Sequence, residues 1–159
     1  MLEQLQAFFQ SLTQNRDQRP SFAPDDIRIA VAGLCLQVMD ADGVIHAAER
    51  EKLRSILREQ YQLDEPSLNA LLEEGARAES EAVDYYRFTS DLKRALNDEQ
   101  RQQLIGILWD IVYADGTRSE MEDHAIWRVA ELLGVSGRDR VHARQGAKSR
   151  SGLTGNDDA

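Results

Sequence analysis

RIAVAGLCLQVMDADGVIHAAE (residues 28–49) and RQQLIGILWDIVYADGTRSEME (residues 101–122) are two copies of one pattern, separated by 73 residues without any gap. The copies share an arginine, a glycine inside an apolar run, an Asp-Gly pair and a glutamate that follows it. These positions are Arg28 and Arg101, Gly33 and Gly106, Gly43 and Gly116, and Glu49 and Glu122. An internal repeat of this kind indicates a duplicated supersecondary unit.

Each copy begins with apolar residues at the i, i+3, i+4, i+7, i+8 spacing of one helix face. They are Val31, Leu34, Cys35, Val38 and Met39 in the first copy, and Leu104, Ile107, Leu108, Ile111 and Val112 in the second. A second helix is expected after each Asp-Gly, where Leu53, Ile56 and Leu57 match Ile126, Val129 and Ala130. Each copy is therefore predicted to be a helical hairpin, and the two hairpins to be pseudo-symmetric.

The shared glycines lie inside the first helix of each hairpin. Glycine costs about 1 kcal/mol relative to alanine at such a position. Close approach of the two long helices would offset this cost, so we expect them to cross at Gly33 and Gly106, near a pseudo-twofold axis.

The rest of the chain completes an all-α domain, a compact bundle of seven to eight helices. Asp64 and Pro66 start one further helix, residues 82–96 form another, and a short last helix follows Ser136. Residues 21–146 form this domain. Residues 1–20 are predicted to be an amphipathic leader helix with a linker, and residues 147–159 a disordered tail.

The charge balance limits the class of partner. The net charge of the 159 residues is −9, although the part from Ser136 onward carries five bases and three acids. The preceding body is more acidic still and would repel a phosphate backbone, which excludes nucleic acid as the main partner. A cation or a basic protein surface suits it better.

Compartment and membrane topology follow from features that the sequence lacks. Cys35 is the single cysteine, so an intramolecular disulfide is excluded. The N-terminus has no basic stretch before an apolar one, which predicts a cytoplasmic protein. No apolar run approaches the roughly 18 residues of a membrane span, so any membrane contact would be peripheral.

The two Asp-Gly turns place carboxylates at matched positions, and oxygen-rich sets of this kind suit calcium, magnesium or manganese. The first turn resembles the last two thirds of an EF-hand loop, with Asp40, Asp42 and Glu49 at positions 3, 5 and 12. Position 1 would be Val38, which has no ligand oxygen, and the second turn departs further. A working EF-hand pair is therefore not expected.

A structural explanation of the same residues stays open beside the cation site. Gly43 and Gly116 would end a helix in the left-handed conformation that glycine adopts without strain. Ser119 and Glu122 would form a capping box that opens the next helix, and His46 with Glu49 a weaker version of it. The aspartates would then be turn formers.

The sequence contains no motif for the other common kinds of metal, nucleotide or catalytic site. The three histidines, His46, His124 and His142, lack zinc-ligand spacing, and no Glu-x-x-His pair occurs. Cys35 aligns with the buried-face residue Leu108, which indicates a core position. A glycine-rich phosphate loop and a nucleophile elbow are both missing. No catalytic activity is expected.

The segment 108–116 (LWDIVYADG), followed by Glu122 and by VAELLGV at 129–135, resembles the tellurite-resistance protein B-like (TerB-like) family, and the first copy resembles its first half. The resemblance covers about residues 25–135. It implies a bundle of seven or eight helices in bacterial proteins linked to tellurite and other stress. Acidic turn residues implicated in binding a divalent metal carry over to Asp40, Asp42, Glu49, Asp115 and Glu122.

Together these observations predict a non-enzymatic, stress-linked helical module that binds a divalent cation or a protein partner through its paired acidic turns. Two alternatives remain. The first is a metal-dependent hydrolase that uses the same carboxylates to activate water. The second is a purely structural interaction module without an ion site.

Overall fold

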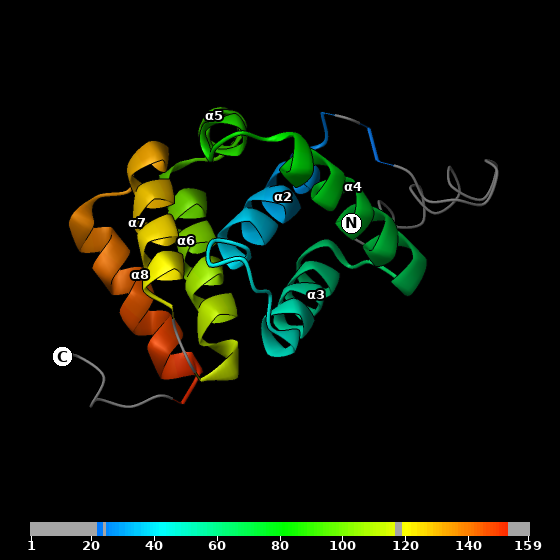
Figure 1. Cartoon of the computed structure of the whole chain (residues 1–159). Helices are drawn as coiled ribbons and strands as arrows, with labels where there is room; N and C mark the ends of the chain where they lie inside the picture. The colour runs from blue at the N-terminus through cyan, green and yellow to red at the C-terminus, as the bar shows by residue number, and fades with distance from the viewer. Residues whose placement is uncertain (1–21, 24, 117–118, 153–159) are drawn as a thin grey trace, which may run out of the picture.

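The computed structural model describes residues 22–23, 25–116 and 119–152, which form seven α-helices and one short 3-10 helix, with no strand among them. The elements are α2 (Ile27–Met39), α3 (Ala47–Tyr61), α4 (Glu65–Glu81), α5 (Tyr86–Ala95), α6 (Asp98–Val112), η1 (Tyr113–Asp115), α7 (Glu120–Leu133) and α8 (Gly137–Arg150) (Figure 1). The predicted all-α class is confirmed. The leader helix and linker assigned to residues 1–20 lie outside the described residues, and no described helix is long and apolar enough to cross a bilayer.

Helix α2 is the centre of the bundle. Nine of its 13 residues are buried, among them Leu34 and Met39, which are fully enclosed. It packs most extensively against α4 and also against α5, whereas α6 packs chiefly against α8. Helix α4 therefore lies on one side of α2, and α6, α7 and α8 lie on the other (Figure 1). Cys35 is fully buried in α2, as predicted, and burial raises the pKa of its thiol to about 12.

The expectation that the two long helices cross at paired glycines is wrong. A Cβ atom on Gly33 would lie 2.7 Å from ring atoms of Phe88 in α5, so this glycine makes room for an aromatic ring. A Cβ atom on Gly106 would meet only the side chain of Arg150, at 3.6 Å. The close helix approach occurs at Gly75 of α4, where a Cβ atom would lie 2.8 Å from the Cβ of Ala32. The pseudo-symmetry of the two hairpins stays a prediction.

The last helix is longer than the sequence indicated. Residues 147–150, assigned to the tail, belong to α8, and Ala147 is fully buried. Arg150 reaches α6, where its Nε donates a hydrogen bond of 3.1 Å to Asp110 Oδ1. This helix is held by small residues and arginine contacts, so it lacks the apolar periodicity that would have revealed its length. Residues 153–159 of the tail lie outside the described part.

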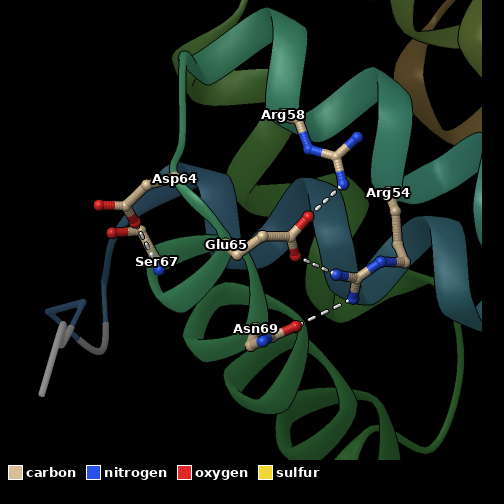
Figure 2. Close-up of polar contacts among 6 residues, drawn as sticks. All are labelled: Arg54, Arg58, Asp64, Glu65, Ser67 and Asn69. Atoms are coloured by element: carbon tan, nitrogen blue, oxygen red, sulfur yellow. Dashed lines mark hydrogen bonds and ion pairs between the residues drawn. The ribbon is translucent and has the colours of Figure 1, made fainter.

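The junction of α3 and α4 is fixed by charged and capping contacts. Figure 2 shows Glu65 between two arginines of α3, with 2.6 Å from Arg54 Nη2 to Oε2 and 2.6 Å from Arg58 Nη2 to Oε1. Asp64 caps α4, because its Oδ1 accepts a hydrogen bond of 2.9 Å from the backbone N–H of Ser67. The helix start predicted from Asp64 and Pro66 is confirmed.

Replacement of this cap gives a test with a defined pH dependence. Hydrogen bonds from Ser67 lower the pKa of Asp64 below its ordinary value of 3.8. The cap therefore stabilises the fold above that pH, and this contribution is lost as the pH falls through the folded-state pKa. We expect Asp64→Ala to lower the free energy of unfolding by about 1 kcal/mol near neutral pH.

Urea denaturation at several pH values measures this effect. Glu73→Ala is the matched control, because Glu73 is an exposed acid in the interior of the same helix. Equal losses in the two variants, or a loss in Asp64→Ala that is constant down to pH about 2, would contradict the capping role.

Candidate functional site

The first acidic turn connects α2 to α3. Asp40 follows the last residue of α2, and its backbone N–H donates a hydrogen bond of 2.9 Å to the carbonyl of Leu36. Asp42 Oδ1 accepts one of 3.0 Å from the backbone N–H of Val44, and Gly43 has a φ of 82°. Asp42 is therefore a turn former, as the structural explanation predicted, and the side chain of Asp40 is at the surface. Gly43 has the predicted left-handed conformation but does not end α2, because the C-cap of that helix is Asp40.

The second acidic turn connects α6 to α7 through η1. Gly116 has a φ of 76°, and its N–H donates a hydrogen bond of 3.1 Å to the carbonyl of Tyr113. The Ser119 hydroxyl caps α7 by accepting from the backbone N–H groups of Met121 and Glu122, at 3.1 and 3.3 Å. The glycine and serine caps are confirmed. His46 precedes α3 but its side chain caps nothing, so the weaker capping box predicted there is wrong.

A buried glutamate follows each turn. Glu49 in the first turn of α3 is 1% exposed, and Glu122 in the first turn of α7 is 2% exposed. Within the described ranges, these two are the charged residues classed as buried. Ionised carboxylates are rarely buried without hydrogen bonds or positive charge around them. The two glutamates that the repeat aligns are therefore also alike in being buried.

The second turn lies against the helix that follows the first turn, because η1 packs on α3. Partial burial and the nearby charge of Asp40 raise the pKa of the Glu79 carboxyl, which places the first turn beside α4 as well. Nevertheless, no three His, Cys, Asp or Glu side chains gather as a metal site in the part of the chain that was described. The side chain of Asp115 lies outside that part, so the five-residue ligand set stays a prediction.

Tyr113 occupies the position in the second turn that Asp40 occupies in the first, and its surroundings explain the difference. The ring stacks on Trp109, with 5.7 Å between centroids, and its hydroxyl accepts a hydrogen bond of 2.9 Å from Arg144 Nε. The guanidinium of Arg144 also lies 5.0 Å from the centre of the Trp109 ring. Tyr113 therefore anchors the second turn to α8, which is a packing role that the repeat alone does not reveal.

An open groove of about 610 Å³ lies beside the second turn, between α3, η1 and the end of α8. Its charged lining consists of Glu51, Lys52, Asp110 and Arg150. Arg150 Nη2 and Asp110 Oδ1 are 3.0 Å apart, so an ion pair closes one side of the groove. Sequence reasoning missed these residues, because they form no motif and Arg150 lies beyond the expected end of the last helix.

Comparison with known proteins gives one finding. A family model described as tellurite resistance protein TerB matches residues 28–145, which is about three quarters of the chain and includes both acidic turns. No curated protein and no solved structure gives a significant match.

Proposed function

Because the chain belongs to the tellurite resistance protein TerB family, we propose that it is a non-enzymatic helical module that binds a divalent cation through its paired acidic turns. One observation supports the proposal above the others. The two Asp-Gly turns are each followed by a buried glutamate, and the helix that carries Glu49 packs against η1 of the second turn.

The chemistry of these groups selects the kind of ion. Carboxylate oxygens are the preferred ligands of calcium, magnesium and manganese, whereas zinc favours nitrogen and sulfur. The N-terminal ends of α3 and α7 stabilise the negative charge of Glu49 and Glu122 before any ion arrives. Asp40, Asp42 and Asp115 would complete the site from the turns themselves. The acidic body of the chain would raise the local cation concentration.

A thermal melt tests this proposal directly. We expect calcium, magnesium or manganese to raise the melting midpoint of the EDTA-treated protein, because an ion that binds only the folded state stabilises it. A tenfold excess over the dissociation constant gives about 1.4 kcal/mol, which is roughly 3–5 °C for a chain of this size. The variant with Asp42→Asn and Asp115→Asn should respond to the ion much less.

The matched control for the first substitution is Asp84→Asn. Asp84 Oδ1 accepts a hydrogen bond of 3.0 Å from the N–H of Tyr86, the same local contact that Asp42 makes with Val44 at the same distance. Both substitutions therefore alter an Asx turn, but only Asp42 belongs to the acidic turns. If none of the ions shifts the wild-type midpoint, the cation site is excluded and the turns are structural.

A protein partner is a second candidate, and the groove beside the second turn favours it. Glu51 and Lys52 line this groove together with the Asp110–Arg150 pair. The groove therefore carries both positively and negatively charged side chains. Such mixed polar surfaces are typical of the rim of transient protein interfaces. Binding of this kind would be unaffected by EDTA, which separates it from the cation site and from a metal-dependent hydrolase.

A further inference from the structure

Two arginines of α8 are held over tryptophan rings. The guanidinium carbon of Arg140 lies 5.2 Å from the centre of the Trp127 ring in α7. That of Arg144 lies 5.0 Å from the centre of the Trp109 ring in α6. Helix α8 packs on α6 and runs beside α7 (Figure 1). The two guanidinium groups therefore lie where α8 meets these two helices, a place that we call the α8 seam.

Neither guanidinium is neutralised by a carboxylate. In the part of the chain that the structure describes, the ion pairs of α7 and α8 do not involve Arg140 or Arg144. Arg144 Nε donates a hydrogen bond of 2.9 Å to the hydroxyl of Tyr113. The other nitrogens of these two side chains make no hydrogen bond to a described residue and are not enclosed. They therefore reach solvent at the seam, where Trp127 is 42% exposed.

The spacing of the two arginines has an electrostatic cost that a bound anion would remove. Arg140 and Arg144 are four residues apart on one helix, so their side chains lie on the same face and repel each other. Contact with an aromatic ring orients a guanidinium without cancelling its charge. Because the planar fork of arginine is already fixed, it loses little freedom when it binds an oxyanion. The seam therefore presents two oriented sets of hydrogen-bond donors, both still charged.

The charge of the seam indicates the class of ligand. Arginine forks bind phosphate oxygens through pairs of parallel hydrogen bonds. A phosphate monoester carries close to two negative charges at neutral pH, which matches two guanidinium groups better than the single charge of a carboxylate. Helix α8 has four arginines and one lysine against one aspartate, so its surroundings are positive although the whole chain has a net charge of −9. An extended polyanion would meet the acidic body, whereas one compact phosphate group would not.

We propose that Arg140 and Arg144 bind the phosphate group of a phosphate monoester at the α8 seam. Both side chains donate to the phosphate oxygens, Arg140 from its place over Trp127 and Arg144 through its two Nη atoms. Tyr113 is a positioning residue, because its hydroxyl holds Arg144 Nε and leaves the Nη atoms available. The site needs no metal, so EDTA leaves it unchanged and its test is independent of the proposed cation site.

Intrinsic fluorescence tests the proposal, because the only two tryptophans of the chain, Trp109 and Trp127, lie under the two arginines. The full chain is titrated with inorganic phosphate at constant ionic strength, up to about 20 mM, which would fill a site of millimolar affinity. We expect a saturable change in the emission. Arg140→Gln and Arg144→Gln should each weaken binding by about tenfold or more, because each removes charge-assisted hydrogen bonds. Arg140→Lys keeps the charge but loses the fork, so it should also weaken binding.

The matched control is Arg138→Gln, which makes the same charge change at an exposed position of the same helix. It should bind phosphate like the wild type, and circular dichroism checks that every variant folds. Emission that does not saturate in the wild type, or an equal loss of affinity in Arg138→Gln, overturns the proposal. Titration with blocked phosphoserine and with glycerol phosphate then identifies the source of the group. Tighter binding of phosphoserine assigns it to a modified protein side chain, and tighter binding of glycerol phosphate to a small phosphorylated molecule.

Discussion

Replacement of Phe88 by alanine should lower the free energy of unfolding by about 3–5 kcal/mol. The ring is 2% exposed and belongs to the main hydrophobic core. It lies against α2 where Gly33 has no side chain, and α5 is one of the helices that pack on α2. Truncation would remove the buried ring surface and leave a cavity at the centre of the bundle.

Urea denaturation followed by circular dichroism measures this loss. Tyr86→Ala is the matched control, because Tyr86 is an aromatic residue of the same helix that is 64% exposed. Its substitution should change the free energy of unfolding by about 0.5 kcal/mol or less. Similar losses in the two variants would show that the ring does not fill the space beside Gly33.

The glycine under the ring supplies a second measurement of the same contact. Gly33→Ala should cost about 1–3 kcal/mol in the wild type, because its Cβ would lie 2.7 Å from the Phe88 ring. In the Phe88→Ala background the added methyl enters the cavity, and the helix propensity of alanine should make the substitution neutral or stabilising. A double-mutant cycle should therefore show strong coupling between the two positions.

The fold class and most helices could be predicted from the sequence, because apolar spacing and capping residues act locally. The spacing around Leu34 and Leu104 indicated the helices that became α2 and α6, and Asp64 caps α4 as expected. The left-handed conformations of Gly43 and Gly116 followed from the Asp-Gly pairs. Each of these features depends on residues within a few positions of one another.

Helix partners could not be predicted, because packing decides them. Helix α2 is buried on nearly every side, so its sequence does not indicate which neighbour covers which face. Gly33 and Gly106 are equivalent in the repeat, yet one lies under an aromatic ring and the other under the end of an arginine side chain. Helix α8 has no apolar stripe, so the periodicity of the sequence does not indicate its last turn.

The candidate site likewise has features that the sequence predicts and features that depend on helix packing. The repeat aligned Glu49 with Glu122, and both are buried in the first turn of a helix. Whether their carboxylates share an ion with Asp115 depends on the orientation of two helices, which the sequence does not encode locally. The groove between Lys52 and Arg150 needs residues about a hundred positions apart to meet, so no motif could have revealed it.

A side chain at Gly75 should be nearly as damaging as the loss of Phe88. In α4, a Cβ atom at this position would lie 2.8 Å from the Cβ of Ala32 and 3.3 Å from backbone atoms of Ala32 and Gly33. Because backbone cannot swing aside as a flexible side chain does, α2 and α4 would have to move apart. We expect Gly75→Val to lower the free energy of unfolding by about 3 kcal/mol, and Gly75→Ala by about 1–2 kcal/mol despite the better helix propensity of alanine.

Gly106→Ala is the control that distinguishes the observed packing from the arrangement expected from the repeat. Its Cβ would meet only the flexible end of Arg150, at 3.6 Å, so alanine should be tolerated and can stabilise α6 by up to about 1 kcal/mol. Chemical denaturation of the two alanine variants under identical conditions makes the comparison. If Gly106→Ala were the more destabilising of the two, the close contact would lie between α2 and α6 rather than between α2 and α4, and the symmetric crossing inferred from the sequence would be the better description.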